Sequence, residues 1–425
     1  MPALLSAQIG TVSPYSRFGL GEFLTPNFLQ GFLMGNQSAA LRDPLSLNLN
    51  NPAASSALKL TTLEMMGRGG WVNQQNNTQG ISQGTALFNY FAMGIPIRDG
   101  LGMAFGFLPY SSIGYRNSES IEYPNIGRAT HEYSGNGGIN KGFLNFGYTP
   151  IKNLHLGAQL GYLFGSFNFN QDVRFNTAGY LNSRFKRNFL LSDVNFNFGV
   201  QYTQAIQENL DLGLGANYSL ENGLATKFDE TYYTFTPSFG NELARDTAIV
   251  RSLNGELLLP MQTAFGMMLG RKARDLYQYS WQISIEYRNS RWSDFTDIDG
   301  NNQGLRNTNG FSLGGEIQPR YAFNKLNRSR NYLDKLRYKV GFYYDELSPT
   351  INSEPLNMFG TTFGLGLPLR IKGLAPGEEK YNTVHLGLHY AQRGTTNNGL
   401  IREEIVQIIF GVTLNDRWFT KYKYR

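Results

Sequence analysis

Few residues in this sequence have the type and spacing needed for catalysis. His385 and His389 share one face of a segment with strand-like alternation, where about 3.3 Å per residue separates them by roughly 13 Å, too far to bind one metal ion. No Gly-rich Walker loop is present, and the absence of Cys removes thiolate metal sites and disulfides. A Ser–His–Asp set can be drawn from any chain of this length, so it carries no weight. The sequence therefore predicts a protein that is not an enzyme and needs no metal or cofactor.

A cluster of charges is more informative. These side chains alternate with apolar residues in three consecutive strand-like segments, so they lie on the polar faces of neighbouring strands. Two interpretations stay open. The charges bind the carboxylate headgroup of an amphipathic ligand, or they form a ladder of neutralising pairs that holds an internal segment, which is the more common use of such a cluster. The residues are Glu286, Arg288, Glu316, Arg320, Arg337 and Lys339.

The segments that position these residues alternate as β-strands do. Residues 154–165, 210–219, 384–391 and 406–414 each place Leu, Val, Ile, Phe or Tyr on one face and mostly Gly, Asn, Gln, Ser or His on the other. The apolar face repeatedly ends in an aromatic residue, as in the aromatic girdles of transmembrane barrels. The core of a soluble β-sandwich would not tolerate the charges on the opposite face. The pattern indicates strands with one face toward lipid and the other toward a polar lumen.

The composition supports a membrane barrel. Charged residues make up 16% of the chain, against about 25% in soluble proteins. The mean hydropathy of -0.34 and the broken apolar runs exclude a bundle of transmembrane helices, each of which needs about 18 apolar residues. The net charge is +6, but no basic run with interleaved aromatics is present, so we expect no nucleic-acid partner.

Short and long connections alternate along the chain, as in bacterial outer-membrane barrels. The tight connections are 98–100, 150–153 and 206–209, and the long polar ones are 117–135, 171–186, 224–247 and 294–308. We therefore predict an all-β fold, a closed antiparallel transmembrane β-barrel of about fourteen strands over residues 58–425, in the outer membrane of a Gram-negative bacterium. Residues 154–165 and 210–220 are expected to pair as a hairpin whose even-numbered residues face lipid.

The N-terminal residues do not fit the strand pattern. Residues 9–57 contain four prolines and no sustained alternation, yet they are too apolar for a free tail. We expect them to form a hatch, or plug, folded into the barrel mouth; a disordered leader is the alternative. Residues 1–8 resemble the end of a secretory signal peptide without its basic start.

Several motifs, in their order along the chain, resemble the FadL-like family of outer-membrane proteins, the long-chain fatty-acid transporters and their PorV-type relatives. The segment Asn51, Pro52 and Ala53 is similar to the signature that precedes the family's first strand. The later motifs are Leu259-Pro-Met261, Trp292-Ser-Asp-Phe295, Leu313-Gly-Gly-Glu316, Tyr338-Lys-Val-Gly-Phe-Tyr344, Phe363-Gly-Leu-Gly-Leu-Pro368 and the ending from Leu414 to Tyr424. The resemblance implies a fourteen-stranded barrel with an N-terminal hatch.

The resemblance also suggests a role for Pro109 at a lateral opening of the barrel. Proline cannot donate to a strand ladder, so Pro109 marks a bulge or break in what we count as the third strand. In the family this strand carries a lateral opening, which makes Phe107, Leu108, Pro109 and Tyr110 the candidate opening here. A local bulge without any role in transport is the alternative.

Two functions follow as hypotheses. The first is transport of hydrophobic small molecules across the outer membrane. The alternative is a non-transporting accessory subunit of an outer-membrane protein-export complex (type IX secretion) or barrel-assembly complex. The expected partners are outer-membrane lipid and either a hydrophobic ligand or a larger outer-membrane complex. Fold alone does not choose between these functions.

Overall fold

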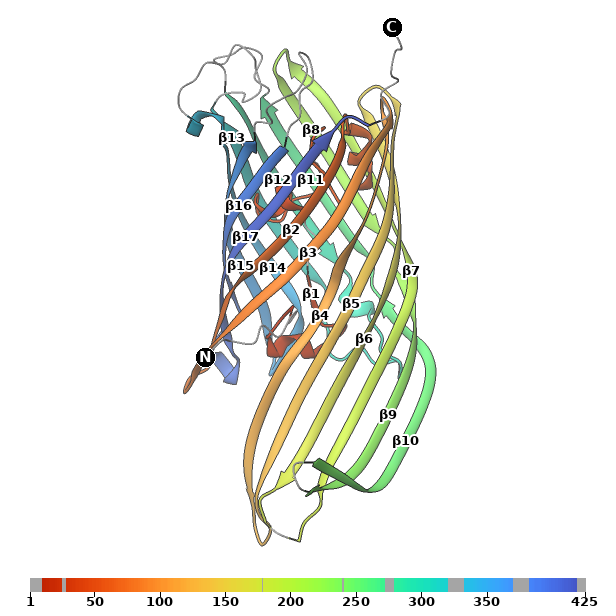
Figure 1. Cartoon of the computed structure of the whole chain (residues 1–425), viewed down its shortest axis with the longest axis vertical. Helices are drawn as coiled ribbons and strands as arrows, with labels where there is room; N and C mark the ends of the chain where they lie inside the picture. Colours follow the sequence, from red (N-terminus) through yellow and green to blue (C-terminus); the bar gives the residue numbers. More distant parts are fainter. Residues whose placement is uncertain are drawn as a thin grey trace.

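The protein is an antiparallel β-barrel with a sheet that continues far beyond one end (Figure 1). The computed structural model describes residues 10–24, 28–177, 179–238, 241–271, 279–319, 332–369 and 382–418. Within them, seven strands from β2 to β8 and seven from β11 to β17 make a ring of fourteen, closed by pairing of β17 with β2. The predicted closed barrel is confirmed. Closure leaves no open sheet edge over most of the ring, which lipid demands.

The ring strands are long enough to cross a bilayer. They are β2 (Thr61–Gln75), β3 (Gly80–Arg98), β4 (Leu101–Tyr123), β5 (Gly127–Ile151), β6 (Leu154–Phe175), β7 (Asn182–Gln207), β8 (Leu210–Ser219), β11 (Gln262–Arg271), β12 (Ser280–Ser290), β13 (Thr308–Gln318), β14 (Arg337–Ile351), β15 (Glu354–Leu369), β16 (Asn382–Arg393) and β17 (Arg402–Asp416). No helix in the described residues is long and apolar enough to span a membrane.

The outer face of the barrel carries the apolar side chains. Even-numbered residues of β6 and β8, including Leu160, Tyr162, Leu214 and Tyr218, are exposed on it, as predicted. The predicted hairpin partner was wrong: β7 lies between β6 and β8 and pairs with both. The first residues of β7, Asn182–Lys186, had been taken for part of a connection, and the position of β7 between β6 and β8 was missed.

Three expected loops are strands. Residues 117–135, 171–186 and 224–247 lie mostly in paired β-structure, in which β4 to β7 run past the barrel and the hairpin of β9 (Asn222–Ser238) and β10 (Asn241–Leu259) joins them. We call these six strands beyond the barrel the extension (lower part of Figure 1). It lies opposite the tight turns, which mark the periplasmic end, so it is extracellular. Outside the membrane the outer face of a strand can be polar, so the lipid-facing apolar residues by which the membrane strands were recognised are missing there.

The described residues between 10 and 60 (10–24 and 28–60) lie inside the barrel and are not part of its wall (Figure 1). They contain only short elements: η1 (Pro14–Arg17), β1 (Glu22–Phe23), α1 (Leu29–Phe32) and η2 (Pro52–Ala57), with η3 (Trp292–Asp294), η4 (Tyr332–Lys335) and η5 (Asn397–Gly399) elsewhere. We call residues 10–60 the N-terminal segment. Its apolar residues, among them Leu29, Leu33 and Met34, form a cluster with the inward faces of the strands.

A ring of inward-facing glycines makes room for the N-terminal segment. A Cβ added at any of them would lie within 3.1 Å of an atom of that segment. They come from twelve strands: Gly94, Gly102, Gly147, Gly157, Gly199, Gly215, Gly266, Gly314, Gly341, Gly364, Gly387 and Gly411. On the remaining two strands, β2 and β12, Glu64 and Glu286 accept hydrogen bonds from the segment. The N-terminal segment therefore contacts all fourteen ring strands.

Candidate functional site

The predicted charge cluster lies in the lumen and faces the N-terminal segment. The backbone N–H groups of Ser38 and Ala39 both donate to one oxygen of Glu286, at 2.6 Å each. Arg288 pairs with the other oxygen at 3.1 Å and with Asp345 at 2.9 Å, while it donates to the carbonyl of Asn36 at 2.9 Å. The Glu286 carboxylate thus holds a turn of the segment, and Arg288 neutralises the charge.

The other described members of the cluster are paired in the same way. Lys339 lies 3.3 Å from Glu316, and Arg337 lies 3.1 Å from Asp43, which belongs to the N-terminal segment. Gln30 of the segment donates to Glu316 at 3.4 Å. Arg320 lies outside the described residues. These pairs favour the ladder that holds the segment over a binding site for a carboxylate headgroup, since the cations already have anionic partners.

The Asn-Pro-Ala motif is built into the same contact layer. Asn51 caps η2 by accepting from the N–H of Ala53 at 3.1 Å and donates to the carbonyl of Ala39 at 2.7 Å. Pro52 and Ala53 lie against Gly157 of β6, where a Cβ would come within 2.1 Å of the Ala53 nitrogen. The motif joins two turns of the segment and fits them against the glycine ring.

Two further carboxylates hold the N-terminal segment, and sequence analysis missed both. Glu64 is fully buried and accepts from the Ser46 hydroxyl at 2.7 Å and from Tyr90 at 3.0 Å. Glu403 accepts from Ser13 at 2.9 Å and pairs with Arg393. Each stands singly on the polar face of its strand, as solvent-exposed charges do, so only the fold reveals its partners.

The strands β3 and β4 separate at the candidate lateral opening. Their pairing ends at Phe91 and Phe107, and beyond that point β4 pairs instead with β1 of the N-terminal segment. Between Pro109 and Ser111 the register of β4 against β5 shifts at Tyr110. The side chains of Leu108 and Tyr110 are buried, whereas Phe107 is exposed on the outer face.

A cavity of about 880 Å³ begins beside this separation, and we call it the outer cleft. Leu87, Phe88, Phe107 and Pro109 line its apolar end. Its other end lies over the extension, where it is lined by Asn117, Asn136, Asn140, Asn170, Arg116, Glu132, Asp172, Arg174, Arg184 and Lys186. The cleft therefore joins an apolar wall to a polar, charged floor.

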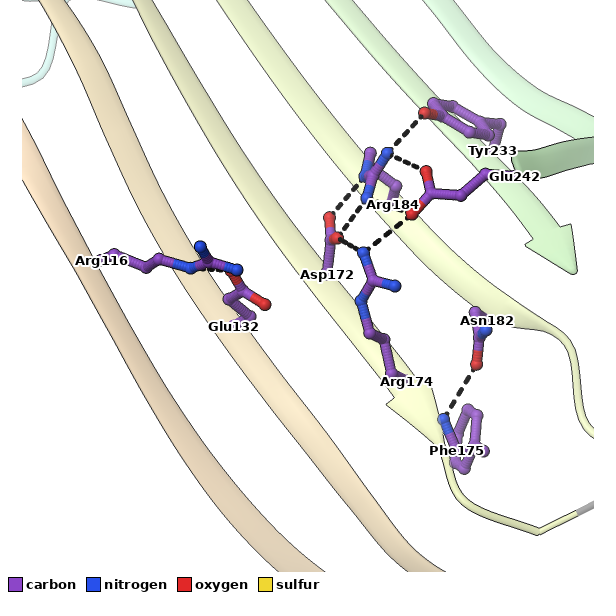
Figure 2. Close-up of polar contacts among 9 residues, drawn as sticks. All are labelled: Arg116, Glu132, Asp172, Arg174, Phe175, Asn182, Arg184, Tyr233 and Glu242. Atoms are coloured by element: carbon purple, nitrogen blue, oxygen red, sulfur yellow. Dashed lines mark hydrogen bonds and ion pairs between the residues drawn. The ribbon is translucent and has the colours of Figure 1, made fainter. Parts of the chain in front are cut away.

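The charged floor is ordered by one network (Figure 2). Arg184 donates to Asp172 at 2.6 Å and also bonds Glu242 and the Tyr233 hydroxyl, while Arg174 pairs with Asp172 and Glu242 at 2.9 Å each. These hydrogen bonds from arginine lower the pKa of Glu242. Burial alone would raise the pKa of Asp172, but the same arginines outweigh it and the pKa is lowered. Both carboxylates are thus held ionised.

Comparison with known proteins shows which family the chain represents. The BamG family model matches residues 1–425, the whole chain. The chain belongs to the BamG family. No curated protein matches it. PorV-type kinship, expected from the sequence, stays a prediction.

Solved structures show the same fold. The CymD monoaromatic hydrocarbon channel is 12% identical, with 93% of this chain and 99% of that chain covered and a TM-score of 0.54. A FadL homologue from Pseudomonas aeruginosa is 12% identical (93% and 98% covered, TM-score 0.53), and the toluene transporter TodX from Pseudomonas putida is 15% identical (94% and 98%, TM-score 0.52). The expected likeness to FadL-type barrels is confirmed for the fold, and the protein is an outer-membrane barrel. At these identities the likeness does not give the function.

The residues that sequence analysis considered for catalysis have structural contacts. His389 lies between the Tyr343 hydroxyl at 2.7 Å and Gln407 at 3.1 Å, and His385 contacts Thr413 at 3.2 Å. Two serines do occur in Gly-x-Ser-x-Gly matches, Ser82 and Ser312, but they lie within β3 and β13 rather than on the strand-to-helix turn of a nucleophile elbow. In the described part of the chain no three His, Asp or Glu side chains converge to hold a metal ion.

Proposed function

We propose that this protein is a non-transporting accessory subunit of an outer-membrane protein-export or barrel-assembly complex. The observation that carries the proposal is the N-terminal segment, which acts as a plug. It contacts all fourteen ring strands and is held by the buried carboxylates Glu64, Glu286 and Glu403. Moving it would strip several hydrogen bonds from buried charges, each worth about 1.5–3 kcal/mol. Such a barrel is a rigid body in the membrane rather than an open conduit.

Two further observations support this role. The extension offers a six-stranded sheet outside the membrane, larger than the turns that a simple barrel needs, and it can serve as a docking surface. Membership in the BamG family also favours work within a complex over the hydrocarbon transport named for the similar structures.

The test is purification of the tagged full chain, expressed at its natural level, in a mild detergent. Accessory function predicts stoichiometric co-purification of a large outer-membrane partner and defects in other outer-membrane proteins when the protein is depleted. A matched tagged barrel of another family controls for non-specific capture. Recovery of the chain alone, with no such defect on depletion, would contradict the proposal.

The second candidate function is passage of hydrophobic small molecules, favoured by the separation of β3 from β4 beside Pro109. An apolar molecule in the outer cleft would lie between Phe88 and Phe107, next to lipid. An unpaired backbone at membrane depth is tolerated only where protein covers it or where it lines a wet cavity, and the outer cleft is such a cavity.

The absence of native Cys allows a direct test of passage. Phe88→Cys and Pro109→Cys, bridged by a cleavable bifunctional thiol reagent, should block uptake of toluene-sized compounds, and reduction should restore it. Phe105→Cys and Leu144→Cys, paired across β4 and β5, give a control bridge that leaves the separation open. Equal uptake with both bridges, or no uptake that depends on the protein, eliminates this second function.

A further inference from the structure

We propose that the outer cleft binds the anionic glycan head of an outer-leaflet glycolipid. The inference concerns a site on the outer face of the extension and does not depend on the accessory role. It rests on three observations. Apolar, amide and charged side chains follow one another along the cleft, and the charged ones lie farthest from the membrane. One cation of the cleft, Lys186, has no ionic partner among the described residues.

The floor of the cleft continues the lipid-facing surface of the barrel. The pairing of β6 with β5 and with β7 has no register shift from Phe164 to Asp172. The even-numbered residues of β6 therefore stay on one face: Phe164 toward lipid, then Asn168 and Asn170, then Asp172 and Arg174. Across the sheet, Lys186 stands opposite Asn170 on the same face.

Distance from the membrane decides which part of a lipid can reach each group. At about 3.3 Å per residue, Asn168 lies roughly 13 Å and Asp172 roughly 26 Å along the strand from Phe164. Acyl chains reach only the apolar end at Phe88 and Phe107. The charges lie too far out for a phosphate next to the acyl chains, but within reach of one carried on a chain of sugars.

The polar groups match a glycan. The side-chain amides of Asn136, Asn140 and Asn170, which share the outer face, offer both donors and acceptors, which suits sugar hydroxyls. Gly138, on the same outer face, carries no side chain, so a flat sugar ring can approach the backbone of β5 there.

The far end of the cleft selects for negative charge. Arg174 and Arg184 are fixed by Asp172 and Glu242, which orients their remaining N–H groups (Figure 2). Lys186 makes no ion pair with a described residue; its Nζ lies 5.6 Å above the ring of Tyr233. Arg116, paired with Glu132, is largely exposed at the opposite wall. Lys186 and Arg116 stand in one row across the sheet with β5 and β6 between them, so each would bind its own phosphate or carboxylate on the glycan. Charge-assisted hydrogen bonds are the strongest that a solvent-exposed cleft can offer.

The experiment measures binding of a rough lipopolysaccharide with a phosphorylated inner core to the purified full chain in detergent. The arms are the intact glycolipid, the same glycolipid after dephosphorylation, and inorganic phosphate as a competitor. Lys186→Gln combined with Arg116→Gln should weaken binding of the intact glycolipid about tenfold.

Arg187→Gln is the matched control, since Arg187 lies over Phe169 and Phe185 on the opposite face of the sheet. Heat-modifiable gel mobility confirms folding of each variant, and Lys186→Arg should retain most of the affinity.

The results separate the possible ligands. Tight binding that requires the phosphates and both cleft cations supports the proposal. Equal binding by the double variant and the parent, or by the dephosphorylated glycolipid and the intact one, overturns it. Full displacement by inorganic phosphate at the glycolipid's own concentration would show that the site holds a free anion, and the lipid assignment would then fail.

Discussion

The interior of the barrel and the extension use the same strands in opposite ways. Inside, β5 and β6 present Gly147 and Gly157 so closely to the N-terminal segment that an added methyl group would strike its backbone. Beyond the membrane the same two strands carry Glu132 and Asp172, whose partners are arginines on neighbouring strands and not the segment. The lumen is thus specified by shape and by buried charge, and the extension by exposed ion pairs. Interactions of the first kind resist change far more strongly than those of the second.

The largest expected effect tests this difference directly. Glu286→Ala removes the acceptor of two segment N–H groups and leaves Arg288 with one carboxylate partner fewer, so it should destabilise the folded protein by about 3–5 kcal/mol. Glu132→Ala breaks an ion pair whose arginine is 77% exposed and should cost about 0–1 kcal/mol. Urea titration of refolding into lipid vesicles measures both. Similar costs for the two variants would refute the contrast between lumen and extension.

The next largest loss of stability should come from placing a charge on the lipid-facing surface of the barrel. Leu160, 46% exposed in the middle of the apolar band of β6, faces lipid, so Leu160→Arg should cost about 2–4 kcal/mol. Leu190 is 61% exposed on the same outer face but beyond that band, and Leu190→Arg should change stability little because water surrounds it. The same titration compares them. If Leu190→Arg costs as much as Leu160→Arg, the membrane boundary is misplaced and the extension is not outside the bilayer.

The sequence predicted the barrel and part of the lumen, but not the extension, because the two regions differ in how their strands face their surroundings. The lipid-facing alternation of segments such as 154–165 predicted a closed barrel only together with the charges on the polar faces and the alternating connection lengths. The same polar faces placed Glu286 and Arg288 in the lumen. Residues 171–186 were misread as a loop because strands in water need no apolar face, and the order of β6, β7 and β8 was lost with them. The partners of Glu64 and Glu403 come from distant parts of the chain, and no local pattern reveals such contacts.

A smaller loss of stability should come from adding a side chain at one of the inward-facing glycines that contact the N-terminal segment. Gly157→Ala would place a Cβ about 2.1 Å from the backbone nitrogen of Ala53, so the segment must shift, at a cost of about 1–3 kcal/mol. Gly142→Ala, on neighbouring β5 with open space around the position, is the control and should be close to neutral. Limited proteolysis of the N-terminal segment reports its displacement. Identical protection in the two variants would show that the contact at Gly157 does not hold the segment.

The smallest effect concerns pH and is confined to the extension. Asp172 and Glu242 have lowered pKa values in the folded protein, so their ion pairs stabilise it above the ordinary values of about 3.9 and 4.3 and are lost as pH falls through the folded values. Amide hydrogen exchange, corrected for its intrinsic pH dependence, should therefore become faster in β9, β10 and the ends of β6 and β7 as the pH falls below these ordinary values, while the barrel stays protected. Asp172→Asn should remove most of this acid dependence. Uniform loosening of barrel and extension would contradict the assignment.

Single-channel conductance in planar bilayers tests the central claim most directly, namely that buried carboxylates hold the N-terminal segment as a plug that closes the lumen. The parent protein should show no stable open level. A variant that combines Glu64→Ala with Glu286→Ala, checked for folding by heat-modifiable mobility, should open frequently because the segment has lost two of its ties. The control is Glu132→Ala in the extension, which should stay closed. Steady conductance in the parent, equal to that of the double variant, would show that the lumen is open without any release of the segment, and the account would be wrong.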